Sequence, residues 1–236
     1  MTEEDWLSAT DPTPMLEFLR GKASDRKLRI IGCNCAWHIL PILQVGRLSA
    51  LLTASERAAD GEDMTSVIGA ILTEFNNDRE HTGQKYTHLV GCPGIAFAAG
   101  HPPQNNLFRQ AFDWLAITAA WWAVPDATVV PESWGTPLDP AWQQAWASER
   151  AWQASTFREV IGNPFHPIPL NPTWQTSTVL ALAQGIYQDR AFDRLPILAD
   201  ALQDASCDNP DLLNHLRSEG PHTRGCWAID LLTNRE

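Results

Sequence analysis

Basic residues are scarce in this chain. Seventeen lysines and arginines stand against 28 aspartates and glutamates, which leaves a formal net charge of −11. A surface of that sign repels the phosphate backbone of nucleic acids, and no basic stripe offsets the repulsion. We therefore do not expect nucleic acid among the partners.

Long apolar runs are lacking as well. No stretch approaches the roughly 20 consecutive apolar residues that a membrane-spanning helix needs. The opening residues, Met1 to Asp5, are acidic, whereas a secretory signal begins with basic residues. We expect a soluble cytoplasmic protein without membrane contact.

The local signatures of common catalytic sites are also missing. The sequence has no Gly-x4-Gly-Lys-Ser/Thr phosphate loop, no Gly-x-Gly-x-x-Gly after a strand, no His-Glu-x-x-His, no Gly-x-Ser-x-Gly and no Cys-x-x-Cys. This favours a non-enzymatic protein. An enzyme whose groups meet only in the folded chain leaves no such trace, so the enzyme class stays open.

What the chain does have is helical periodicity, with cap residues in the right places. An all-α fold of about ten helices follows, in which Pro41 ends or kinks one helix. The expected helices cover residues 25–40, 46–59, 64–75, 107–124 and 140–161, with shorter ones opened by Thr2, Asp11, Thr176 or Ser177, Asp193, Asn209 and Thr223.

Two segments break this periodicity. Residues 76–106 contain several glycines and prolines and predict a long central loop, with a short strand at residues 88–90. Phe165 to Leu170 carries two prolines and predicts an extended strap across helices. We divide the chain into a helical part (1–75), a variable middle (76–156) and a second helical part (157–236), packed as one compact unit.

Three motifs in the last third carry a family resemblance: GNPF-x-P, RAFDRLP-x-LADAL and GPH-x-RGCW-x-x-DLL. Together with TDPTPMLEFLRGKASDRKLR and the Cys-x-Cys that follows it, they resemble an uncharacterised family of bacterial proteins. The resemblance covers about half of the chain and implies no particular chemistry. The middle of the chain does not match it, so we look there for functions peculiar to this protein.

The five cysteines form no disulfide-scaffold spacing, and in the cytoplasm they stay reduced. Cys33 and Cys35 form a C-x-C pair, and His222 and Cys226 are four residues apart. If the last helix begins at Thr223, His222 and Cys226 point the same way, and these four residues would suit zinc. However, C-x-C in a helix splays its thiols about 200° apart, so packing in the core is the favoured interpretation and no cofactor is expected.

Other reactive side chains have plain alternatives. Cys207 and His215 lie near the candidate zinc ligands in sequence but match no ligand spacing. A Cys–His nucleophilic pair from the loop is the enzymatic alternative to a solvated loop; its candidates are His81, His88, Cys92 and His101. We expect Glu149, Arg150 and Glu159 to be solvated helix charges. Arg224 is an anion contact or, more simply, a capping or ion-pairing residue.

Eleven tryptophans are many for this length. Five of them lie in or beside irregular, Pro-rich segments in the middle of the chain, and tryptophan is enriched at binding hot spots. They predict a partner-contacting surface, with burial in the core as the equally weighted alternative. The five are Trp121, Trp122, Trp134, Trp142 and Trp146.

Two functions follow from these patterns. The first is a non-enzymatic cytoplasmic helical module that contacts another protein through the tryptophan surface. The second is a metal- or thiol-dependent enzyme that uses the cysteines and histidines.

Overall fold

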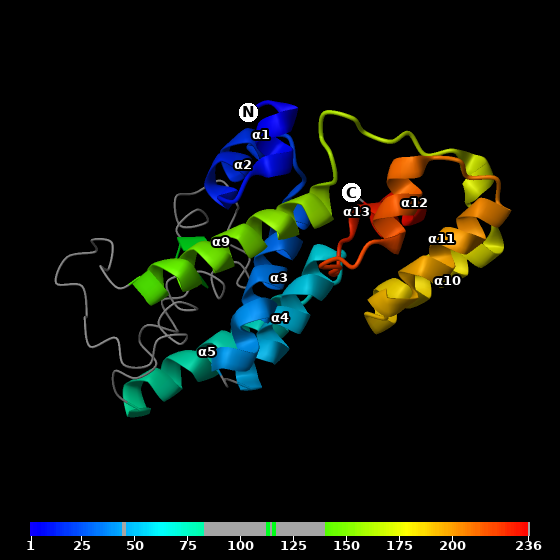
Figure 1. Ribbon diagram of the computed structural model, residues 1–236. Coiled ribbons are helices and arrows are strands. Elements are labelled where there is room, and N and C mark those ends of the chain that lie inside the picture. The colour runs from blue at the N-terminus through cyan, green and yellow to red at the C-terminus, as the bar shows by residue number, and fades with distance from the viewer. Residues whose placement is uncertain (44–45, 83–111, 114, 117–139, 236) are drawn as a thin grey trace. The chain divides into compact units, whose positions relative to one another are not determined.

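The computed structural model of the chain describes residues 1–43, 46–82, 112–113, 115–116 and 140–235. Within these residues it contains ten α-helices, two short 3-10 turns and no strand, which confirms the predicted all-α class (Figure 1). None of the described helices is long and apolar enough to cross a membrane. Residues 8–154 form one compact unit, and residues 2–7 with 155–236 form a second.

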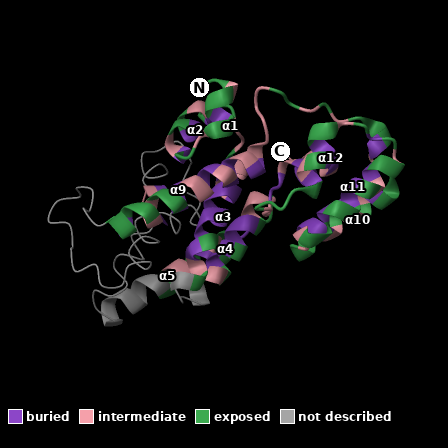
Figure 2. Cartoon of the chain, viewed as in Figure 1, coloured by how far each residue is buried: buried purple, intermediate pink, exposed green. Residues whose placement is uncertain are grey.

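The first unit contains α2 (Pro12–Leu19), α3 (Asp25–Leu43), α4 (Gly46–Ala59), α5 (Thr65–Thr82) and most of α9 (Pro140–Ile161). Their caps match the sequence: Asp11 accepts from the Thr13 amide at 2.8 Å, and Ser24 accepts from the Lys27 amide at 3.2 Å. α3 packs against α4 and α4 against α5, and buried residues are concentrated on α3 and α4 (Figure 2).

The second unit contains α1 (Glu3–Ser8), the last turns of α9, α10 (Ser177–Asp189), α11 (Leu195–Asp204), α12 (Pro210–Arg217) and α13 (Trp227–Thr233). The 3-10 turns Pro172–Trp174 and Phe192–Arg194 precede α10 and α11. The predicted strap lies outside the helices, with Ile168 and Leu170 packed on the core of this unit. That core is built mainly from leucines, isoleucines and alanines of α10 to α13.

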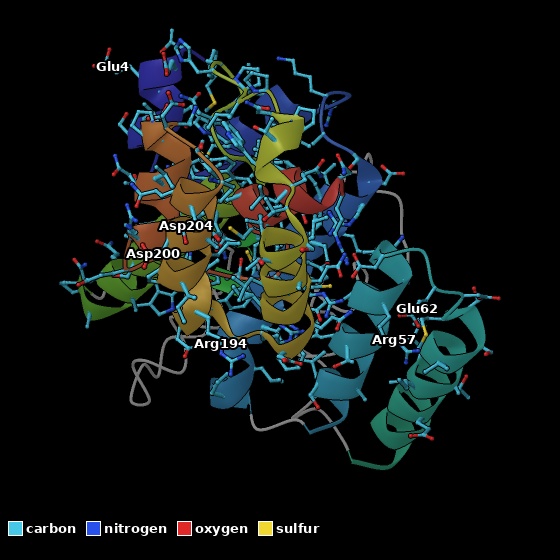
Figure 3. All side chains as sticks on the ribbon, turned by 90° about the vertical axis from the view of Figure 1, so that its right-hand side faces the viewer. Glu4, Arg57, Glu62, Arg194, Asp200 and Asp204 are labelled. Carbon is cyan, nitrogen blue, oxygen red and sulfur yellow. The ribbon has the colours of Figure 1, made fainter. Side chains whose placement is uncertain are left out.

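Both units carry ion pairs on their surfaces. Arg57 at the end of α4 pairs with Glu62 in the following turn, and both are labelled in Figure 3. Asp200 on α11 pairs with Arg217 on α12 at 2.7 Å. Such half-exposed pairs contribute little to stability, so burial of the apolar faces holds each unit together.

Four predicted boundaries are wrong. α3 continues past Pro41 to Leu43, so this proline lies inside the helix and does not end it. α5 continues to Thr82 rather than ending at Phe75, since no glycine or proline occurs between Asn76 and Thr82. α11 begins at Leu195 rather than after Asp193, and α13 begins at Trp227 rather than at Thr223.

The late start of α13 has a local cause. Gly225 adopts a left-handed backbone with φ of +82°, which interrupts any helix that would begin at Thr223. His222 therefore lies in a loop, and Cys226 is the residue directly before the helix. The helical spacing that we used to place His222 and Cys226 on one face does not apply.

Glu149 and Arg150, predicted to be solvated, are instead buried in the first unit. The Arg150 guanidinium is held by Asp113 at 2.7 Å, by Thr13 at 2.5 Å and by Asp11. Glu149 accepts a hydrogen bond from the Gln153 amide at 3.2 Å, and its other oxygen lies 3.4 Å from His38 Nε2. The His38 ring stacks on Trp152 at 3.8 Å.

In the described part of the chain, Glu149 contacts the Gln153 amide and the His38 ring. Burial raises the pKa of Glu149 from 4.5 to about 7, against a lowering by the Gln153 hydrogen bond. Burial also lowers the pKa of His38, which makes that ring a neutral neighbour near pH 7. At neutral pH this carboxyl group is therefore divided between its protonated and ionised forms.

We predict that Glu149 makes the first unit less stable as pH rises. The folded chain keeps a proton that the unfolded chain loses near pH 4.5, so stability falls between pH 4.5 and about 7 and is constant above that range. E149Q should remove this loss and gain about 2–3 kcal/mol relative to the unaltered chain between pH 5 and pH 8. Urea unfolding at both pH values, with the exposed E17Q as control, measures the difference. A difference that does not vary with pH contradicts the prediction.

Candidate metal centre

Four potential metal ligands meet in the second unit. They are Glu159, His215, His222 and Cys226, and one ligand atom from each lies within 4.8 Å of the other three. Glu159 stands in the last full turn of α9, His215 in α12, His222 in the loop after α12, and Cys226 directly before α13. Among the described residues they form the one group of this kind.

Local sequence features place each ligand. Asn209 caps α12 by accepting from the Leu212 amide at 2.9 Å, and Pro210 takes the first helical position. Leu212, Leu213 and Leu216 then bury one side of α12, which brings His215 to the edge of the core. The His222 ring is oriented by a backbone contact on the side away from Glu159, because its Nε2 lies 3.0 Å from the Ser218 carbonyl oxygen.

The carboxylate of Glu159 lies between the two histidines. Its Oε1 is 3.2 Å from His222 Nδ1, and its Oε2 is 3.4 Å from His215 Nε2. The same His215 Nε2 is 3.2 Å from Cys226 Sγ. A single ring nitrogen therefore faces both the thiol and the carboxylate, although it can offer only one proton or one lone pair.

This geometry differs from a thiol-activating triad. In such a triad one ring nitrogen faces the nucleophile and the other faces the carboxylate that orients it. Here Cys226 and Glu159 share Nε2, and the Cys226 side chain is fully buried. The arrangement suits a common metal ion better than attack on a substrate.

Burial and the shared carboxylate set the electrostatics. Burial raises the pKa of Cys226 well above its usual range, and the Glu159 charge raises it further, while the Ile229 and Ala228 amides lower it. Burial lowers the pKa of His215, against the effect of Glu159. For His222 burial also acts downward, but the hydrogen bond and charge of Glu159 leave the pKa raised.

The sequence anticipated half of this group. His222 and Cys226 do come together, but their zinc partners were predicted to be Cys33 and Cys35, which are buried in α3 of the first unit. For His215 the sequence indicates only that it lies near the candidate zinc ligands. The prediction that Glu159 is a solvated helix charge is wrong, because its side chain is only 4% exposed. Cys207 is buried in the core of the second unit.

The sequence also predicted a Cys–His pair in the loop and a contact role for Arg224. His88, Cys92 and His101 lie outside the described residues, and His81 lies near the end of α5. The Arg224 guanidinium stacks 4.5 Å from the centre of the Tyr187 ring.

The five tryptophans of the predicted partner surface divide in two. Trp121, Trp122 and Trp134 lie outside the described residues. Trp142 is 6% exposed in the first unit, whereas Trp146 is partly exposed with Arg150 5.4 Å from its ring. Burial of Trp142 favours a role in the core for that residue. Contact of the tryptophan surface with another protein stays a prediction.

Comparison with known proteins adds no relative. No protein family, no curated protein and no solved structure matches the chain. Any functional conclusion therefore depends on the geometry described above.

We predict that Trp142 acts in the core. Replacing it with alanine removes a buried indole and should lower the free energy of unfolding by roughly 3–5 kcal/mol. Trp146→Ala is the matched control on the same helix and should cost clearly less, because this ring is only partly buried. Urea unfolding of both variants tests this, and equal small losses would contradict it.

Proposed function

We propose that the second unit is a zinc-binding module and that Glu159, His215, His222 and Cys226 are the ligands. The metal would be held by one carboxylate oxygen, His215 Nε2, His222 Nδ1 and the Cys226 thiolate. The observation that carries this proposal is the convergence of four donor atoms from four chain segments, with Glu159 and Cys226 buried and the two histidines partly buried.

The spacing of the donor atoms supports a tetrahedral ion. Zinc bonds of about 2.0–2.3 Å place neighbouring ligand atoms about 3.3–3.6 Å apart. His215 Nε2 lies 3.2 Å from Cys226 Sγ and 3.4 Å from Glu159 Oε2, and His222 Nδ1 lies 3.2 Å from the other carboxylate oxygen, Oε1. One donor atom from each residue lies within 4.8 Å of the other three, so side-chain adjustment toward one ion would give the spacing of zinc ligands.

The charges of the group support a divalent ion. A thiolate and a carboxylate together carry two negative charges, and the two histidines bind metal in their neutral form. A divalent cation makes the buried group neutral as a whole, which removes the cost of an uncompensated buried charge. Thiolate and imidazole ligands favour zinc among common divalent ions, since calcium and magnesium prefer oxygen.

A site with four protein ligands supports a structural role. Catalytic zinc sites keep one position for water or substrate, whereas structural sites are closed by the protein. Here the ion would join the end of α9, α12, the loop after it and the start of α13. We therefore propose that the metal stabilises a helical module that is not an enzyme.

The proposal predicts about one zinc ion per chain in protein purified without chelator. Cys226→Ser and His215→Ala should lose the ion, whereas Cys35→Ala, a buried cysteine of the first unit, should keep it. Metal analysis gives the stoichiometry, and Co²⁺ substitution should give thiolate charge-transfer absorption that C226S abolishes. At a thousandfold excess over the dissociation constant, zinc should stabilise the module by about 4 kcal/mol.

Two results would overturn this proposal. One is a folded, metal-free chain that takes up neither Zn²⁺ nor Co²⁺. The other is metal retained by both C226S and H215A but lost by C35A, which would return the site to the cysteines of α3.

A further inference from the structure

A short segment from the other end of the sequence belongs to the second unit. Residues 2–7 group with residues 155–236, and α1 forms most of this segment. Thr2 and Asp5 cap α1 reciprocally, with Thr2 N to Asp5 Oδ2 at 2.8 Å and Asp5 N to Thr2 Oγ1 at 3.1 Å. The cap directs Trp6 into the unit, where its side chain is fully buried.

Trp6 forms hydrogen bonds with residues on both sides of Glu159 in the sequence. Its indole Nε1 donates to the Gly162 carbonyl oxygen at 3.0 Å, and its own carbonyl oxygen accepts from Arg158 Nη1 at 3.1 Å. Glu3 adds a third contact, because its Oε1 accepts from Asn163 Nδ2 at 2.7 Å. The last turn of α9, which carries Glu159, is therefore fixed from outside the helix.

Gly162 also links this turn to the remaining ligands. Its φ of +76° suits glycine, and an added Cβ would lie 3.1 Å from Trp227 Cγ, so Trp227 packs directly on the glycine backbone. Trp227 follows Cys226, and its ring centre lies 4.8 Å from that of His215. A contact path thus runs from Trp6 through Gly162 to Trp227 and the metal ligands.

We propose that Trp6 is a positioning residue for the metal site, acting through Arg158 and Gly162. This inference rests on the proposed zinc function. The end of a helix frays because its last carbonyl groups have no partner within the helix. By fixing Arg158 and Gly162, Trp6 keeps Glu159 oriented toward the two histidines and keeps Trp227 seated beside His215.

The test compares the zinc affinity of three variants under conditions in which all of them are folded. Trp6→Phe keeps a buried aromatic ring but removes the donor to Gly162, and Arg158→Lys weakens the second bond without altering Trp6. Each should weaken zinc binding roughly 10- to 100-fold, as expected for groups that orient ligands. Leu7→Ala, next to Trp6 but 54% exposed, should bind zinc as the unaltered chain does.

Competition with a chromophoric chelator gives the affinities, and Co²⁺ absorption reports the ligand geometry. A purely structural role for Trp6 lowers stability but leaves the affinity and the Co²⁺ spectrum of the folded chain unchanged, and that result would refute the inference alone. Absence of metal binding by the unaltered chain would remove the proposed function together with it. If W6F fails to fold, R158K decides by the same two measurements.

Discussion

The need to accommodate a buried carboxylate at the end of α9 governs the second unit. Glu159 is almost fully buried, and an unpaired charge at that position would lower the free energy of unfolding by several kcal/mol. Two histidines and a thiol surround it, each from a different segment. Three local features bring these partners to the carboxylate. They are the capped α12, the loop after it and the late start of α13.

α9 carries a second buried glutamate that is accommodated differently. Glu149 has an amide and a neutral ring beside it, while Arg150 is engaged by Asp11 and Asp113. Burial raises the pKa of Glu149 to about 7, so near neutral pH this carboxyl group is divided between its protonated and ionised forms. Ten residues along the same helix, Glu159 lies among donor atoms that a metal ion can join. The two buried carboxyl groups therefore differ in their neighbours and not in residue type.

Local signals explain which parts of the fold could be predicted. Asn209-Pro210 and Thr176 fixed the starts of α12 and α10, because a cap acts through atoms only a few residues apart. The start of α13 was missed because it depends on the conformation of Gly225. Glu159 was missed for a different reason: its partners lie 56 to 67 residues further along the sequence, and polar spacing on a helix does not reveal burial by distant segments.

The membership of residues 2–7 in the second unit has a consequence for biosynthesis. Trp6 is translated 152 residues before Arg158, the group that its carbonyl oxygen will meet. Until residues 158–162 have been synthesised, the groups that Trp6 bonds in the folded chain are not available. Completion of the second unit therefore requires a non-local contact across 152 residues of sequence, which forms only after the end of α9 has been made.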